Sequence, residues 1–185
     1  SALVRDQFVE LLESTGGLIL LTGPTGSGKT TAIYAALAWL IQKYGDEISI
    51  STIEDPIEIP MEHLSQSQLA VHNGFTYPVA LRSLMRQDPQ VIMIGEIRDA
   101  ETAAVAVQAS LTGHLVISTI HSGSTAGVFT RMLNMGIEPF LLCSSIIAVL
   151  GMRLLPQNCG MCAAPYVPEI GEDSQLSQEI LDAAE

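Results

Sequence analysis

The stretch that most constrains this chain is Gly-Pro-Thr-Gly-Ser-Gly-Lys-Thr at residues 23–30. It follows an apolar run at residues 18–22 and opens an alanine-rich run at residues 31–44, so it predicts a strand, a phosphate-binding loop and a helix. Glycines let successive backbone N–H groups converge on an anion, and the helix N-terminus adds partial positive charge. The alternative is a glycine-rich turn that merely precedes a helix, but strand, helix and Lys-Thr pair together favour the phosphate loop.

The anion expected in this loop is the phosphate chain of a nucleotide. Lys29 is predicted to reach the β- and γ-phosphates, and the Thr30 hydroxyl to hold a Mg²⁺ that bridges them. The residues predicted to bind the nucleotide are Gly23, Pro24, Thr25, Gly26, Ser27, Gly28, Lys29, Thr30 and Thr31.

Composition limits the classes of protein to which the chain can belong. Its 185 residues, 48% of them apolar, suit one domain with a substantial core. The longest uncharged apolar run, at residues 139–152, is too short to cross a bilayer, and no signal sequence opens the chain, so we expect a cytosolic protein. A net charge of -12 argues against a nucleic-acid-binding surface, which needs basic side chains to neutralise phosphates.

The hydrophobic pattern alternates between strand-like and helix-like segments. Such alternation predicts an α/β fold with a mostly parallel central sheet flanked by helices. Strands are expected at residues 18–22, 48–53, 91–94 and 114–119, with a further short strand at residues 69–71. Helices are expected at residues 5–13, 31–44, 77–86, 100–111, 124–134 and 138–155, with caps at Thr76 and Asp99.

Charged side chains follow the predicted strands at the edge where parallel sheets bind ligands. Glu96 follows the strand at residues 91–94, and we expect it to activate a water for attack on the γ-phosphate. The alternative is a local ion pair with Arg98. Glu54 is expected to support Mg²⁺ or the same water, or else to be a solvated acid in an Asp-Pro turn.

Two histidines and two cysteines are further candidates. His114 and His121 bracket the predicted strand at residues 114–119 and are either catalytic groups or structural hydrogen-bonding residues. Cys159 and Cys162 have the spacing of zinc ligands, but a four-coordinate zinc site needs two more ligands, and no Cys or His follows them in this chain. They are half a zinc site or simply two cysteines in a turn.

Four blocks of this sequence together resemble one family, the secretion ATPases of type II secretion and type IV pilus systems. The blocks are GPTGSGKTT at residues 23–31, STIEDPIE at 51–58, LRSLMRQDPQVIMIGEIRD at 81–99 and TGHLVISTIH at 112–121. The resemblance covers most of residues 17–166. It implies a RecA-like P-loop domain that hydrolyses ATP with Mg²⁺ and drives the assembly of a pilus or pseudopilus, or protein export.

The resemblance also implies roles for individual residues and for partners. Glu96 would be the catalytic glutamate, Glu54 would assist the metal or water, and His114 and His121 would contact the γ-phosphate region. The protein would act as a homo-hexamer on the cytoplasmic face of the inner membrane, held there by platform proteins of the secretion or pilus system. The Cys pair would belong to a zinc subdomain with two Cys pairs, which is typical of export and assembly members.

The same resemblance leads us to expect a truncated chain. Residues 1–155 would form the ATPase domain, and residues 156–185 would begin the Cys-containing subdomain and its acidic C-terminal segment. The family's preceding subdomain, which gives arginines to a neighbour's nucleotide, is not in this sequence. We therefore expect the domain alone to bind ATP·Mg²⁺ and to turn over slowly, because an arginine supplied in trans contributes about 10³–10⁵ in rate in other P-loop enzymes.

Three other functions remain open. A P-loop kinase would need a second-substrate pocket and a basic lid, and the sequence shows no arginine-rich lid. A regulatory module would hold nucleotide without hydrolysing it. A RecA-like nucleic-acid translocase would share the fold, although the acidic charge balance argues against that function.

Overall fold

The computed structural model describes residues 2–162, and these form a six-stranded, wholly parallel sheet in the order β3-β2-β4-β5-β1-β6. The strands are β1 (Gly17–Thr22), β2 (Ile50–Glu54), β3 (Ser65–Gln68), β4 (Val91–Ile94), β5 (Leu115–Thr119) and β6 (Ile146–Gly151). The helices are α1 (Ala2–Leu12), α2 (Lys29–Tyr44), α3 (Tyr77–Leu84), α4 (Ala100–Leu111), α5 (Thr125–Asn134) and α6 (Pro139–Ser145). The predicted α/β fold with a parallel sheet flanked by helices is confirmed.

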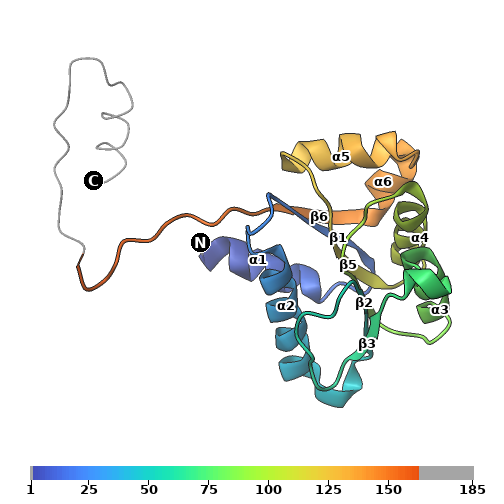
Figure 1. Cartoon of the computed structure of the whole chain (residues 1–185), viewed down its shortest axis with the longest axis horizontal. Coiled ribbons are helices and arrows are strands. Elements are labelled where there is room, and N and C mark those ends of the chain that lie inside the picture. The colour runs from blue at the N-terminus through green and yellow to red at the C-terminus, as the bar shows by residue number, and fades with distance from the viewer. Residues whose placement is uncertain (1, 163–185) are drawn as a thin grey trace. The chain divides into compact units, whose positions relative to one another are not determined.

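Helices cover both faces of this sheet, as Figure 1 shows, with α1 and α2 on one face and α3, α4, α5 and α6 on the other. Side chains of β1 point alternately to the two faces of the sheet: Leu18 and Leu20 pack against α3 to α6, while Ile19 and Leu21 pack against α2. Because both faces are covered, β1 and β4 are buried at every position, as expected for strands inside a parallel sheet. Two separate hydrophobic cores therefore hold the central strands rigidly.

Side-chain caps fix where two helices begin. The Asp99 carboxylate accepts a hydrogen bond from the backbone N–H of Thr102 at the start of α4, and the Ser124 hydroxyl accepts one from Gly127 at the start of α5. Each cap satisfies a backbone donor that has no partner within its helix. Thr76 precedes α3 as expected, but its side chain makes no capping bond.

Two sequence-based predictions of secondary structure are wrong. The run at residues 138–155 is not one helix, because α6 ends at Ser145 and residues 146–151 form β6, which pairs in parallel with β1. The Ile146, Ile147 and Val149 side chains are β-branched and favour a strand when an unpaired sheet edge lies beside them. The short strand predicted at residues 69–71 lies earlier, as the polar edge strand β3 beside β2.

The chain divides into two compact units, residues 1–154 and 155–185, and the second contains Cys159 and Cys162. The assignment of residues 156–185 to a separate subdomain stays a prediction, and residues 163–185 lie outside the described part. Among residues 2–162, no helix is long and apolar enough to span a bilayer.

Candidate active site

A cleft of about 540 Å³ opens where the loops after β1, β2, β4 and β5 meet at the carboxyl edge of the sheet. Crevices at this edge are where open α/β sheets bind ligands. The predicted site residues that line it are Thr25, Gly26, Ser27, Gly28, Lys29, Thr30, Thr31, Glu54, Glu96 and His121. Four segments that are far apart in the sequence are thus brought to one place.

Glycines allow the phosphate loop its tight path. Gly28 adopts a left-handed conformation (φ 86°) immediately before α2, a region that side chains with a Cβ rarely enter. Gly23 passes so close to β6 that a Cβ there would lie 2.3 Å from the Met152 carbonyl oxygen. Gly23 and Pro24 do not line the cleft and instead border a neighbouring pocket beside Ser122 and Met152.

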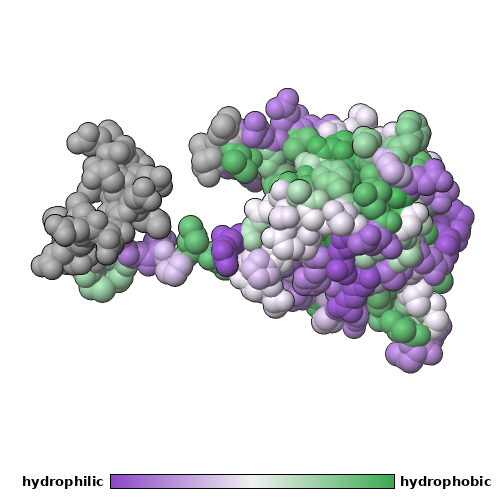
Figure 2. Space-filling model, turned by 90° about the horizontal axis from the view of Figure 1, so that it is seen from above, coloured by the Kyte–Doolittle hydropathy of each residue, from purple (hydrophilic) through white to green (hydrophobic). Residues whose placement is uncertain are grey.

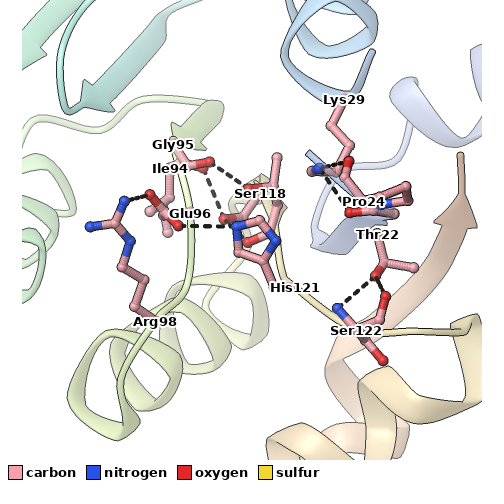
Figure 3. A network of polar contacts seen from close by, with 12 residues as sticks. Thr22, Pro24, Lys29, Ile94, Gly95, Glu96, Arg98, Ser118, His121 and Ser122 are labelled. Atoms are coloured by element: carbon pink, nitrogen blue, oxygen red, sulfur yellow. Dashed lines mark hydrogen bonds and ion pairs between the residues drawn. The ribbon is translucent and has the colours of Figure 1, made fainter. Parts of the chain in front are cut away.

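Two polar groups in this loop have bonds still to make. Within residues 2–162, the Lys29 Nζ donates to the Gly23 and Pro24 carbonyl oxygens alone, each at 2.9 Å, although an ammonium has three donors (Figure 3). The Ser27 hydroxyl is buried and has no hydrogen-bond partner in the part of the chain that the structure describes. A buried polar group without a partner is rare and costly. The loop therefore fits a bound phosphate chain, which would supply acceptors to both groups.

Glu96 follows β4 and lines the same cleft as the phosphate loop. Its side chain is 16% exposed, and one carboxylate oxygen pairs with the Arg98 guanidinium. The other oxygen lies 3.6 Å from the His121 Nε2, which points toward it in Figure 3. The local pair with Arg98 and the position in the cleft thus occur together. A carboxylate has about four acceptor sites, so these two contacts leave room for a water.

Neighbouring strands fix the backbone that carries Glu96. The Gly95 N–H donates to the Ile53 carbonyl oxygen on β2 (2.8 Å), and the Gly95 carbonyl accepts from the Thr119 hydroxyl on β5 (2.8 Å). The Ile97 N–H donates to the Thr119 carbonyl oxygen (2.9 Å). Because bonds to both neighbours flank Glu96, its position is set by the sheet rather than by a free loop.

The loop after β5 is tied to the start of the phosphate loop. The Thr22 hydroxyl, buried at the end of β1, donates to the Ser122 carbonyl oxygen (3.0 Å) and accepts from the Ser122 N–H (3.1 Å). Figure 3 shows this pair beside His121. A shift of the phosphate loop would therefore also move Ser122, the residue next to His121.

Glu54 lies deeper than the other acids of the cleft, with only 3% of its surface exposed. Its carboxylate accepts hydrogen bonds from the Tyr34 hydroxyl, the Thr52 hydroxyl and the Gln66 amide (3.1 Å from Nε2). The alternative of a solvated acid in a turn is therefore wrong, because the side chain points inward. A carboxylate this buried requires such donors.

Oxygen donors around the phosphate loop suit Mg²⁺. Thr30, Glu54 and Glu96 all line the cleft, and Mg²⁺ prefers oxygen ligands, with one or two protein groups completed by phosphates and waters. Among residues 2–162, no cluster of three or more His, Cys, Asp and Glu side chains could hold a metal by itself. The residues present therefore fit a metal that arrives with a nucleotide.

His114 is not brought to this cleft. It precedes β5, at the amino edge of the sheet, where its Nδ1 lies 3.0 Å from the Ala109 carbonyl oxygen and 3.3 Å from the Thr112 hydroxyl. These contacts tie the end of α4 to the start of β5. The catalytic role predicted for His114 gains no support from this position.

The two cysteines of the second unit are exposed and unpaired. A hydrogen bond from the Met161 backbone and contact with Cys162 lower the pKa of the Cys159 thiol. A lower pKa favours the thiolate, the form that binds metals. The zinc half-site stays a prediction.

Two tyrosines at the site were missed from the sequence. Tyr77 lines the cleft, and burial, followed by the nearby Glu96 charge, raises its pKa to about 12, so its hydroxyl stays protonated at neutral pH. Gly95 makes room for this hydroxyl, since a Cβ there would lie 2.8 Å from its oxygen. Tyr34 contacts Glu54, and its spacing of four residues from Thr30 along a helix is the signal that could have revealed it.

A family model described as "Type II/IV secretion system protein" matches residues 2–183 of this chain. The chain belongs to this family. The resemblance that the four sequence blocks carry is thereby confirmed. Within the family, the chain is 52% identical over 161 residues to a type II secretion system protein E of Aeromonas hydrophila, covering 87% of this chain and 32% of that protein. It is 48% identical over 158 residues to the type IV pilus assembly ATPase PilB of Myxococcus xanthus, covering 85% and 27%.

Solved structures agree with this assignment to the type II/IV secretion family. The pilus retraction motor PilT with bound ADP superposes with a TM-score of 0.74 at 35% identity, covering 84% of this chain and 47% of that one. The predicted fold class, an α/β P-loop domain with a parallel central sheet flanked by helices, is thus confirmed. The chain spans about a third of the length of the curated relatives.

Proposed function

We propose that this chain is the ATP-hydrolysing motor domain of a type II secretion or type IV pilus assembly ATPase. The observation that carries the proposal is the cleft itself, whose lining includes Lys29, Thr30 and Glu96. Relatives named as a pilus assembly ATPase and as a pilus retraction motor with bound ADP support it. Its machine would assemble a pilus or pseudopilus or export protein.

The phosphate loop would hold the ATP triphosphate. Lys29 would exchange its bonds to the Gly23 and Pro24 carbonyl oxygens for phosphate oxygens, and the Ser27 hydroxyl would gain the partner it lacks. Backbone N–H groups at the start of α2 would face the same anion. Thr30 would hold Mg²⁺ with Glu54 nearby, and this metal would neutralise charge on the β- and γ-phosphates.

Glu96 would act as the general base. As a water oxygen attacks the γ-phosphorus and the bond to the β-phosphate oxygen breaks, Glu96 would accept the water's proton, and ADP and phosphate would result. Arg98 and His121 would hold the carboxylate in the orientation that this transfer needs. His121 would also lie within reach of the γ-phosphate region.

Turnover by the chain alone is proposed to be slow. Arg98 is the one arginine among residues 2–162 that lines the cleft, and it is already paired with Glu96. Stabilisation of the charge that develops on the γ-phosphate would therefore depend on a cation from another subunit. In other P-loop enzymes, such a cation raises the rate of hydrolysis about 10³–10⁵-fold. A homo-hexamer on the cytoplasmic side of the inner membrane, held by platform proteins, is the proposed working form.

The surface is consistent with such assembly. Figure 2, seen from the side of α5, shows hydrophobic residues gathered into a broad area beside polar regions. Large apolar side chains exposed on α5 and α6 include Phe129, Leu133 and Phe140. Large exposed apolar areas are uncommon on monomeric proteins and usually mark sites of protein interaction. No nucleic-acid partner is proposed.

Glu96→Gln tests the proposal, because an amide keeps the size of the side chain and cannot accept the proton. ATP hydrolysis, measured as phosphate release over long incubations, is expected to fall about 10²–10⁴-fold while ATP binding changes by less than about threefold. Glu101→Gln is the matched control, since Glu101 also pairs with an arginine, Arg82, but on the surface.

Three results would contradict the motor assignment. A wild-type chain that binds ATP and never releases phosphate, even when concentrated enough to assemble, would be a regulatory binding module. Hydrolysis stimulated by DNA would indicate a translocase. Equal hydrolysis by wild type and Glu96→Gln would remove Glu96 from the chemistry.

A further inference from the structure

Tyr34 lies on the helix that follows the phosphate loop, at a position that links the loop to Glu54. It comes four residues after Thr30 on α2, and residues at this spacing are neighbours on one side of a helix. The Tyr34 ring is buried, with 5% of the residue exposed, and its hydroxyl donates to the Glu54 Oε2. One side of α2 thus carries both the proposed Mg²⁺ ligand and a donor to the buried acid.

The two oxygens of the Glu54 carboxylate are held differently. Oε1 accepts from the Thr52 hydroxyl and the Gln66 amide, whereas Oε2 accepts from Tyr34 as its one partner among the described residues. All three donors are neutral, and no ion pair joins Glu54 within residues 2–162. Loss of the Tyr34 hydroxyl would leave Oε2 free to turn, and the direction of the carboxylate would no longer be fixed.

The Tyr34 hydroxyl keeps its proton, as a donor must. Burial raises its pKa above the usual value near 10, and the hydrogen bond to the Glu54 carboxylate raises it further. Deprotonation would place two negative oxygens in contact inside the protein. The Tyr34 hydroxyl is therefore protonated at neutral pH and can donate to Glu54.

The same hydroxyl also accepts a bond from the chain between β2 and β3. The Ile59 N–H donates to the Tyr34 Oη (3.3 Å), and Gln66 bonds both the Ile59 carbonyl oxygen (3.1 Å) and the Met61 N–H (2.7 Å). Glu58, next to Ile59, lines the cleft. Tyr34 therefore joins α2, the end of β2 and the cleft rim through one oxygen.

We propose that Tyr34 is a positioning residue that holds the Glu54 carboxylate in place in the cleft that Thr30 also lines, and so sets how the site uses Mg²⁺. The inference rests on the proposed ATPase function and adds a residue to it. Tyr34 touches neither nucleotide nor metal in this account. It acts through Glu54.

Tyr34→Phe removes the hydroxyl and keeps the ring, and Tyr44→Phe makes the same change ten residues further along α2 as the control. Residues that orient a metal ligand typically contribute 10- to 100-fold to metal affinity or activity. For Tyr34→Phe we expect kcat to fall about 10- to 100-fold, with the ATP KM within about threefold. The Mg²⁺ concentration that half-saturates binding of a fluorescent ATP analogue should rise over a similar range, a readout that does not depend on turnover.

A double-mutant cycle tests whether Tyr34 acts through Glu54. In a Glu54→Gln background, Tyr34→Phe is expected to lower kcat by less than about twofold, because the carboxylate that it positions is already gone. Effects that multiply would overturn the inference, since they would mean that Tyr34 acts independently of Glu54. A Tyr34→Phe chain that matches Tyr44→Phe in kcat and Mg²⁺ dependence would overturn it as well.

Two controls separate failure of this inference from other failures. If wild type shows no hydrolysis, the proposed function fails; if wild type hydrolyses ATP and only the Tyr34 effects are missing, the positioning role alone fails. Thermal unfolding shows whether Tyr34→Phe is folded at the assay temperature. If it is not, the comparison with Tyr44→Phe is repeated below its unfolding midpoint, where an unchanged kcat and an unchanged Mg²⁺ dependence would contradict the role.

Discussion

Two histidines seven residues apart, His114 and His121, flank the same strand and end at opposite edges of the sheet. His121 follows β5 at the carboxyl edge, half exposed (51%), with its Nε2 3.6 Å from the Glu96 carboxylate. His114 precedes β5 at the amino edge, and its hydrogen bonds among the described residues go to the Ala109 carbonyl oxygen and the Thr112 hydroxyl at the end of α4. The strand between them separates a histidine that faces the cleft from one that supports the fold.

The difference shows that strand direction decides what a polar side chain can do in this fold. Lys29, Glu54, Glu96 and His121 all come at or after the carboxyl ends of strands, and all of them line one cleft. At the amino edge, similar groups are used for local bonds, as when the Gln90 side chain accepts from the Ser49 N–H. Polar side chains at the carboxyl edge are therefore expected to take part in catalysis or binding, and those at the amino edge to stabilise the fold.

The strongest test of this contrast is Lys29→Met, at the carboxyl edge. Charge-assisted hydrogen bonds contribute about 1.5–3 kcal/mol each, so loss of the ammonium should weaken ATP binding about 100-fold. Titration with a fluorescent ATP analogue measures this. Lys43→Met is the matched control, because Lys43 lies on the same helix but pairs at the surface with Glu13. Equal affinity in the two variants would mean that the loop does not grip phosphates.

A smaller effect is expected for His121→Gln, which keeps a polar group at the carboxyl edge. The contact with Glu96 is long and partly exposed, so we expect kcat to fall about tenfold, or about 1.4 kcal/mol in the barrier, with ATP binding nearly unchanged. Steady-state phosphate release measures this. A change of less than twofold would show that His121 faces the cleft without taking part.

The smallest effect on turnover is expected for His114→Ala at the amino edge. Its loss removes hydrogen bonds at the turn between α4 and β5, each contributing about 0.5–1.5 kcal/mol to stability. The thermal midpoint should fall by a few degrees, roughly 2–4 °C for each kcal/mol, while kcat stays within about twofold. A large loss of turnover without loss of stability would mean that His114, at the amino edge, takes part in catalysis, which contradicts the proposed difference between the two edges.

The sequence predicts an element of this fold well where neighbouring residues encode it, and poorly where contacts distant in the sequence decide it. The phosphate loop, the cap at Asp99 and the buried strand β4 are encoded by neighbouring residues, and the structure has all three. The apolar run at residues 146–151 suits either a helix or a strand, and pairing with the edge of β1 is what decides for a strand. The edge strand β3, Ser-Gln-Ser-Gln, carries no hydrophobic pattern at all.

The site follows the same rule. The sequence predicts Glu54, Glu96 and His121 at the cleft because each comes at the end of a predicted strand, which is a local signal, and all three line it. The contact between Tyr34 and Glu54 joins residues twenty positions apart on different elements. The four-residue spacing from Thr30 indicates that Tyr34 lies on the same side of α2, but it does not predict Glu54 as the partner. His114 shares a sequence motif with His121, but the direction of β5 places it at the other edge of the sheet.

The most direct test of the account is a crystal structure of the Glu96→Gln chain with ATP and Mg²⁺. We predict that the Lys29 Nζ leaves the Gly23 and Pro24 carbonyl oxygens for phosphate oxygens, and that residue 96 bonds, at about 2.6–3.2 Å, a water in line with the γ-phosphate. A structure in which residue 96 points away from the nucleotide and another group holds that water would contradict the account.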